Sequence, residues 1–492
     1  MTRSLVTFLL SPKEYASICK SGLSKHSHDS DSPSAAKFRS ACRSFTAAYA
    51  LTLAIDVAIP ASLGKQGIKE LLRKAQKNAI RSGLSFAGVF LSHPILLAFL
   101  IRFRQKLVQR RGRPSPCKSL RYFQSLCSTE YFPPIVAGVL SGTALAIHPP
   151  GNRRVSIAIY LFTKAVESFY KFMGAEGYLP NLPWWFGSWM MAPFASSQLL
   201  HAMFFDGDCF PNSFKSFIFG FSNSYVKKRP ADYPAHLAWP DGDTIIKNIA
   251  EISRKNYPKF KSPVLRPGAS TVPLVFEEIS PILNLAHPSI TYLSCASLHP
   301  DNPSCTKTLL EFCARQLVPV SKFMFVFYTC LGLLRYERVK KDPLSFIMLT
   351  AQKIAGVSAF VTFGFGTCWA SVCAFQRILP DNFLPRWRFH LAGFIGGLFA
   401  FLDREHGKSR VDSLVRLSLA SSWKIVEKRH KKINLKHVDV YLFAASLGII
   451  MALFQSSPSA FSDSLTRKSL NVLCGNSWVD PVKVANRNNK AE

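Results

Sequence analysis

The chain has 492 residues, 48% of them hydrophobic and 13% aromatic, and such a length alone would suit two or three soluble domains. Its 61 Lys and Arg residues against 29 Asp and Glu residues give a net charge of +32, most of which lies between apolar blocks. That pattern suits anionic lipid head groups. It argues against nucleic-acid binding, because the 40 Phe residues lie largely inside the apolar blocks rather than on a basic surface.

A flexible polar arm is expected over residues 1–40. Between Ser21 and Lys37 the chain is rich in Ser, His and Asp and has almost no bulky apolar side chain, so burial cannot offset the entropy of ordering. The first residues lack the small-residue cleavage pattern of a secretory signal. The 12 Cys residues are scattered, which indicates reduced thiols rather than a disulfide-stapled domain.

Eight apolar blocks follow this arm, and a helix needs about 20 residues to cross the hydrocarbon core of a bilayer. Any single block could be a buried helix of a soluble protein. Together they predict an all-α, multi-pass integral membrane protein. The blocks are Phe45–Leu63, Gly83–Ile101, Pro134–Ile147, Pro183–Phe205, Val318–Leu334, Phe346–Phe375, His390–Leu402 and Val438–Phe454.

A polar, basic linker is predicted at 223–284, where several Pro residues and the run KKRP surround one amphipathic piece at Asp243–Lys255. The linker separates a first membrane repeat at 41–222 from a second at 285–456, which opens with a segment that contains Cys and His. Residues 457–492 are expected to form a polar tail.

The two membrane repeats look like copies of each other. The pattern AGxxxG that starts at Ala137 recurs from Ala392, an offset of 392 − 137 = 255, and the glycine of the following turn recurs as Gly151 and Gly407. The structure is therefore expected to consist of two similar helical halves, as is common in membrane transport folds. Each half is expected to hold about five helices: two apolar ones, the glycine-containing one, an amphipathic one and a last apolar one.

Each half contains a small-xxx-small pattern, formed by Gly138 with Gly142 and by Gly393 with Gly397. This pattern lets two helix backbones approach closely in lipid. A single GxxxG can arise from composition alone, because Gly is common in membrane helices. Its recurrence at the same position of both halves predicts that the four glycines pack helices.

Two basic turns follow the glycine-containing helices, with Arg153 and Arg154 in the first and Lys408 and Arg410 in the second. One interpretation is an interfacial turn whose long side chains extend toward water. The sharper hypothesis is contact with a lipid head group or an acyl phosphate, helped by the N-terminus of the next helix.

Four ionisable residues lie inside apolar blocks, where charge is costly and often functional. Asp56, His93, His201 and Lys353 could mark a path for a solute or a proton. The two halves do not share these positions, however, and partial exposure at a helix end explains each of them nearly as well.

Cys295, His299 and Cys305 are candidate metal ligands, because thiolate and imidazole are the usual ligands of zinc. His287 and Cys313 lie nearby in the sequence. No CxxC knuckle is present, and Cys313 falls where the next helix should already have begun. The sequence therefore favours a structural Cys and His segment at the membrane surface and predicts no metal and no other cofactor.

The motifs that usually accompany catalysis are missing from the sequence. It contains no phosphate-binding loop, dinucleotide fingerprint, nucleophile elbow or HExxH helix. The chain is accordingly not expected to be an enzyme.

Several segments carry a family resemblance. They are CASLHPDNPSC at Cys295–Cys305, the AGxxxG helices, the turns at Gly151–Ser168 and Gly407–Trp423, and GYLPNLP at Gly177–Pro183. In these segments the chain resembles the transmembrane protein 135 family, also called peroxisomal membrane protein 52. The helical hairpin with its GxxxG is more distantly similar to channel subunits of mitochondrial inner-membrane protein translocases.

The resemblance implies a multi-pass protein of an organelle membrane, peroxisomal or mitochondrial, of which the peroxisomal membrane is favoured. It implies a role in membrane organisation, lipid metabolism or organelle dynamics; the alternative is a transporter or channel with a site between the two repeats. Expected partners are membrane lipids with anionic head groups, together with a second copy of the chain or other membrane proteins, and no nucleic acid.

Overall fold

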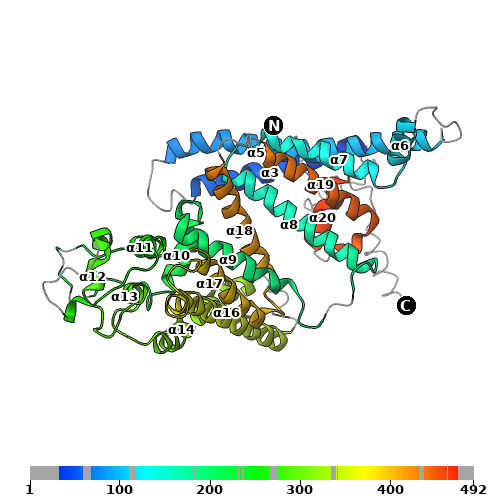
Figure 1. Cartoon of the computed structure of the whole chain (residues 1–492). Helices are drawn as coiled ribbons and strands as arrows, with labels where there is room; N and C mark the ends of the chain where they lie inside the picture. Colours follow the sequence, from blue (N-terminus) through cyan, green and yellow to red (C-terminus); the bar gives the residue numbers. More distant parts are fainter. Residues whose placement is uncertain are drawn as a thin grey trace. The chain divides into compact units, whose positions relative to one another are not determined.

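The computed structural model describes the chain as two compact units, of which unit 1 comprises Met1–Asn181 and Asn434–Glu492 and unit 2 comprises Leu182–Ile433. The described residues are 33–58, 68–109, 118–180, 183–230, 233–234, 236, 238–265, 274–333, 340, 342–430, 437–461 and 464–474. Their regular structure is helical throughout, apart from one isolated bridge between Lys259 and Tyr292 (Figure 1). The expected all-α fold class is confirmed for these residues.

Three described helices are long and apolar enough to cross a membrane: α5 (Ile68–Gln109), α16 (Pro343–Ile378) and α19 (Val438–Ser456). Each contains one of the predicted apolar blocks. In the most apolar stretch of α16 only 17% of the residues are buried within the protein, and in that of α5 only 33%. In α19 the corresponding share is 67%. Apolar helices with as few buried residues as α5 and α16 are typical of proteins with lipid around them.

Unit 1 combines helices from both ends of the chain. Its core contains Val89 of α5, Ala158 of α8 and Phe454 of α19, so α19 completes a core that the first third of the chain begins. The other helices of this unit are α3 (Pro33–Leu53), η1 (Ala54–Ala58), α6 (Lys118–Cys127), α7 (Phe132–Gly142), η3 (Thr143–Ile147), α8 (Asn152–Ala175), η9 (Pro458–Ala460) and α20 (Ser464–Leu473).

Unit 2 is built around α9 (Met191–Phe205), which packs against α17 (Trp387–Leu398) and α18 (Lys408–Arg429). Helix α16 begins where Asp342 accepts a hydrogen bond from the Ser345 amide at 3.2 Å and Pro343 occupies the first turn, both of which favour a helix start. The remaining helices are η4 (Ser188–Met190), η5 (Gly207–Cys209), α10 (Asn212–Gly220), α11 (Gly242–Arg254), η6 (Pro263–Leu265), η7 (Leu274–Ile279), α12 (Ser280–Leu283), α13 (Leu293–Leu298), α14 (Cys305–Leu333) and η8 (Phe399–Asp403).

Helix α7 lies against α19 in unit 1 (Figure 1). The two glycines of α7 lie at this contact. A β-carbon at Gly138 would lie 2.7 Å from Cα of Gly448, and one at Gly142 would lie 2.6 Å from Cα of Ala444. Such distances are much shorter than a van der Waals contact between two carbon atoms, and the neighbouring atoms belong to the backbone. The two helices can pack this closely only because neither glycine carries a side chain.

Helix α17 makes the corresponding contact with α9 in unit 2. A β-carbon at Gly393 would lie 2.5 Å from the carbonyl oxygen of Ser196, and one at Gly397 would lie 2.5 Å from Cα of Pro193. Both glycine pairs thus lie at a backbone-to-backbone contact, and in each case the partner helix lies far away in the sequence.

Residues 223–284, expected to be a polar linker, contribute to the core of unit 2 instead. Helix α11 begins where Asp241 accepts a hydrogen bond from the Thr244 amide at 2.7 Å. Its Ile245, Ile249 and Ile252 are fully buried and pack in the same cluster as Phe389 of α17. The amphipathic pattern was visible in the sequence, but the surface that covers it comes from segments distant in the chain.

The ends of the chain are described only in part. Of the arm predicted over residues 1–40, residues 1–32 lie outside the described part, and α3 begins at Pro33. Of the tail predicted over 457–492, residues 464–473 form α20, and residues 475–492 lie outside the described part.

The substitution Gly397→Ala is expected to lower the free energy of unfolding by about 1–3 kcal/mol, because the added methyl group meets the backbone of Pro193. Gly174→Ala, on α8, is the matched control, since the nearest atom to its new methyl group is a leucine methyl 3.8 Å away. Thermal unfolding of the detergent-solubilised protein measures both. Equal melting temperatures for the two variants would contradict the packing role.

Candidate functional site

An apolar cavity of about 720 Å³ lies within unit 2. Its wall consists mainly of aromatic and aliphatic side chains from α9, α10, α14, α16 and α18, among them Leu199, Phe217, Phe327, Phe365 and Leu417. The volume falls in the range of about 300–1,000 Å³ that is usual for small-molecule sites. The lining suits an apolar ligand, such as a hydrocarbon chain.

Basic side chains also line this cavity. Arg410, the third residue of α18, donates hydrogen bonds of 2.6 and 2.5 Å to the two carboxylate oxygens of Asp403 and a further one to the hydroxyl of Tyr328. Burial raises the pKa of the Asp403 carboxyl, and the hydrogen bond from Arg410 acts in the opposite direction. The pair fixes the guanidinium beside the cavity, with the side chain of Arg410 27% exposed.

Lys353 of α16 lines the same part of the cavity. It precedes Gly356 by about one helical turn, and a β-carbon at Gly356 would lie 3.0 Å from an oxygen of Asp403. His406, in the turn before α18, also lines the cavity. Three cationic or titratable groups therefore lie in one part of a cavity whose wall is mainly apolar.

The lining follows α16 from Phe346 to Trp369, and the stretch from Lys353 to Trp369 is the longer part of it. Sixteen residues at about 1.5 Å rise per residue span roughly 24 Å, compared with ~15 Å for one leaflet of a bilayer whose hydrocarbon core is ~30 Å thick. The cavity is thus long enough to hold an acyl chain whose polar end lies among the basic residues.

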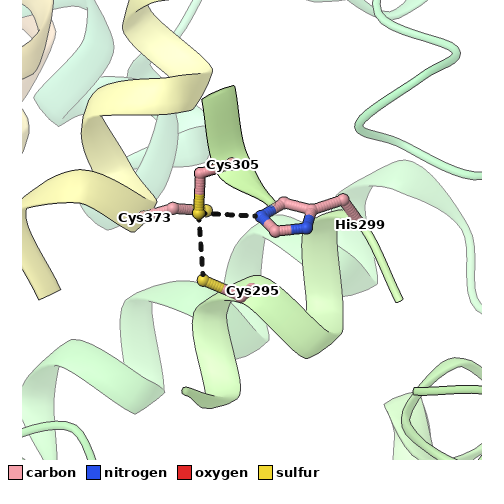
Figure 2. A group of neighbouring side chains, drawn as sticks. All are labelled: Cys295, His299, Cys305 and Cys373. Atoms are coloured by element: carbon pink, nitrogen blue, oxygen red, sulfur yellow. Dashed lines mark hydrogen bonds between the residues drawn. The ribbon is translucent and has the colours of Figure 1, made fainter. Parts of the chain in front are cut away.

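A second constellation gathers Cys295, His299, Cys305 and Cys373 in unit 2 (Figure 2). One ligand atom from each residue lies within 4.8 Å of the other three. The Sγ atoms of Cys295 and Cys305 are 3.7 Å apart, and the Cys305 Sγ lies 3.5 Å from Nε2 of His299. Hydrogen bonds with Cys295, Cys373 and His299 lower the pKa of the Cys305 thiol.

Three members of this group are the residues that the sequence offered as metal ligands, and the fourth, Cys373, was missed. Cys373 lies inside an apolar block, where a cysteine is ordinarily a small core residue. His287 and Cys313 are not members: Nδ1 of His287 accepts a hydrogen bond from the Ser289 amide, and Cys313 lies two helical turns beyond Cys305. Only the packing of α16 against α13 reveals the complete set.

The four basic residues proposed for head-group contact have different surroundings. Arg154 forms a buried, two-bond ion pair with Asp439 of α19 at 2.5 and 3.2 Å, so this side chain has a structural partner. Arg153 forms an ion pair with Asp56. Lys408 is the first residue of α18, and of the four only Arg410 lines the cavity.

The four residues proposed for a transport path are divided between the units. In unit 1, Asp56 pairs with Arg153, and Nδ1 of the fully buried His93 lies 3.1 Å from the carbonyl oxygen of Leu473. In unit 2, Lys353 lines the cavity, whereas the ring of His201 stacks on that of His390 with centroids 4.1 Å apart. Lys353 is thus the member of this set that meets the cavity.

Asp439→Asn is expected to lower the free energy of unfolding by about 3–5 kcal/mol, because Arg154 would remain buried without its counter-charge. The control is Asp56→Asn, which leaves Arg153, with 49% of its side chain exposed, free to be solvated and should cost less than about 1 kcal/mol. Denaturant unfolding of the purified protein compares the two variants, and similar losses for both would show that the Arg154 pair has no special role.

Comparison of the chain with models of protein families, with curated proteins and with solved structures finds no match.

Proposed function

We propose that the chain is a multi-pass protein of an organelle membrane that binds the acyl chain of an anionic lipid in the cavity of unit 2. The observation that carries this proposal is the pairing of a long, aromatic-walled cavity with Lys353, His406 and Arg410. An acyl chain would occupy the apolar length, and its carboxylate or phosphate would meet the basic groups.

A membrane location is supported by the exposed apolar surface of unit 2 around the cavity. On α14, Phe325 and Val326 are each 60% exposed, and on α16, Leu344 is 70% and Ile347 62% exposed. In water these side chains would form a large apolar patch, which soluble monomers rarely display. In a bilayer the same surface is favourable, and a lipid could enter the cavity from the surrounding leaflet.

Two similar halves are part of the same proposal. Each half would contain five helices in the same order, α3, α5, α7, α8 and α9 in the first and α14, α16, α17, α18 and α19 in the second. The glycine helix of each half packs against the last helix of the other half. Arg154 and Arg410, each the third residue of its helix, both pair with a buried aspartate.

The organelle and the biological process rest on the resemblance to the transmembrane protein 135 family. That resemblance favours the peroxisomal membrane over the mitochondrial one and a part in lipid metabolism, membrane organisation or organelle dynamics. Lipid binding by unit 2 is the molecular activity that would connect the cavity with those processes.

A transporter or channel is the second candidate function, and the observation that favours it is the position of Lys353. This residue lies in a candidate membrane-spanning helix and lines the cavity, as a substrate or counter-ion site would require. Flux of a solute into proteoliposomes that is abolished by Lys353→Met, without capture of lipid, would favour this candidate over lipid binding.

Photo-cross-linking with a fatty acid that carries a diazirine on its chain tests the proposal on the full-length protein. Label is expected on peptides of α14 and α16, and Val361→Trp, which fills the cavity, should abolish it. Leu349→Trp, on the same helix but outside the cavity lining, is the control. Equal labelling of the two variants would contradict binding in the cavity.

A separate substitution tests whether the basic residues of the cavity bind the head group of the lipid. Lys353→Met is expected to weaken capture of the anionic fatty acid by about tenfold, because a hydrogen bond to a charged group contributes about 1.5–3 kcal/mol. Lys322→Met on α14, outside the lining, should leave capture unchanged.

Imaging of the tagged chain against organelle markers is expected to place it in peroxisomal membranes, and a soluble distribution would overturn the membrane assignment.

A further inference from the structure

The separations within the Cys and His group match those of ligands around one tetrahedral ion. Zinc lies about 2.3 Å from a thiolate sulfur and about 2.0–2.1 Å from an imidazole nitrogen, which places two sulfurs about 3.8 Å apart and sulfur and nitrogen about 3.6 Å apart. The observed distances are 3.7 Å between the Sγ atoms of Cys295 and Cys305 and 3.5 Å between the Cys305 Sγ and Nε2 of His299. No rearrangement of the backbone is needed to bring these three atoms to a common ion.

A second, independent feature is the orientation of the imidazole. Nδ1 of His299 lies 2.7 Å from the backbone carbonyl oxygen of Asn302, which can only accept a hydrogen bond. Nδ1 therefore carries a proton, which leaves Nε2, the ring nitrogen that faces the sulfur atoms (Figure 2), as the one that can bind a metal ion. A hydrogen bond from the remote ring nitrogen to a carbonyl is the usual arrangement around a metal-bound histidine.

The local chain fixes this arrangement. His299 follows α13 directly, and the Asn302 side chain accepts a hydrogen bond from the Ser304 amide at 3.0 Å, which shapes the turn before α14. Cys305 is the first residue of α14, where the positive end of the helix dipole favours a thiolate. Two ligands come from α13 and its end, one from the start of α14 and one from α16.

We propose that Cys295, His299, Cys305 and Cys373 bind one zinc ion in a structural site. Three thiolates and one imidazole complete a tetrahedron, so no position remains open for a substrate. Soft sulfur ligands exclude magnesium and calcium as occupants. The site is largely closed to solvent, because Cys373 is fully buried, His299 is 2% exposed and Cys295 is 5% exposed, while Cys305 is partly buried.

The ion would join three segments of unit 2, of which α13 and α16 are also joined by a hydrogen bond of 3.2 Å from the Ser294 amide to Oε1 of Gln376. It would tie α13, and with it the core that α11 and α12 contribute to, onto the long helices α14 and α16. Trp369 lies about one helical turn before Cys373 and lines the apolar cavity. Zinc would thus fix the part of the cavity wall that Trp369 forms. Binding of zinc does not depend on whether the cavity binds a lipid.

A disulfide between Cys295 and Cys305 is the competing chemistry for the two closest thiols. The 3.7 Å between their sulfur atoms far exceeds the 2.05 Å of a disulfide bond, and both thiols are free in the structure. A disulfide would also leave Cys373 and His299 without a role, whereas one metal ion uses all four groups.

Elemental analysis of the full-length protein, purified in detergent without chelators, tests the proposal. About one zinc per chain is expected, and a cobalt-substituted sample should show the intense visible absorption of tetrahedral cobalt thiolate. Cys373→Ser and Cys305→Ser should each reduce bound zinc at least about tenfold. Cys368→Ser on α16 and Cys313→Ser on α14 are the matched controls and should retain it.

If the variants that lack a ligand do not fold, the same proposal can be tested on the wild-type protein. A strong chelator should lower its melting temperature and expose three additional reactive thiols, Cys295, Cys305 and Cys373, at the same time. Protein that contains no zinc and has all its cysteines reactive would overturn the proposal. A Cys295–Cys305 disulfide found by mass spectrometry, or iron in place of zinc, would overturn it equally.

Discussion

Close contact between helix backbones at small residues is the constraint on which both units depend. At Gly138 and Gly142 in unit 1, and at Gly393 and Gly397 in unit 2, a β-carbon would lie 2.5–2.7 Å from backbone atoms of the partner helix. In the membrane that we propose, apolar helices would gain no hydrophobic drive to associate, so van der Waals contact and polar bonds would have to supply the stability. The glycines allow the van der Waals contact, and in unit 1 the buried Arg154–Asp439 ion pair provides the polar bonds.

These contacts are also distant in the chain. Arg154 and Asp439 are separated by 285 residues, so α19 finds its place only after nearly the whole sequence has been made. In unit 2, likewise, α9 comes early in the chain and can make its contact only once α17, nearly 200 residues later, has been made. Contacts of such long range are slow to form. The cavity and the Cys and His group both lie in unit 2, where the helices that follow α13 complete them.

Much of the helical architecture could be predicted from apolar blocks and glycine spacing, because these are local properties of the sequence. Three features could not. The buried face of α11 was visible as Ile245, Ile249 and Ile252, but its covering surface comes from α17 and other distant segments. Cys373 lies 68 residues after Cys305 in an apolar helix, with no motif to connect them. The sequence around Arg154 resembles that of an interfacial arginine, and only the structure shows its ion pair with Asp439.

The packing of α7 against α19 can be tested directly with a small photoreactive diazirine amino acid in place of Val139. Val139 contacts Gly448 in the structure, with its Cγ2 only 2.8 Å from where a β-carbon would lie. Mass spectrometry of the cross-linked, full-length protein in membranes should find Val139 joined to the α19 peptide that contains Gly448. Cross-links to α9 in place of α19 would contradict the account.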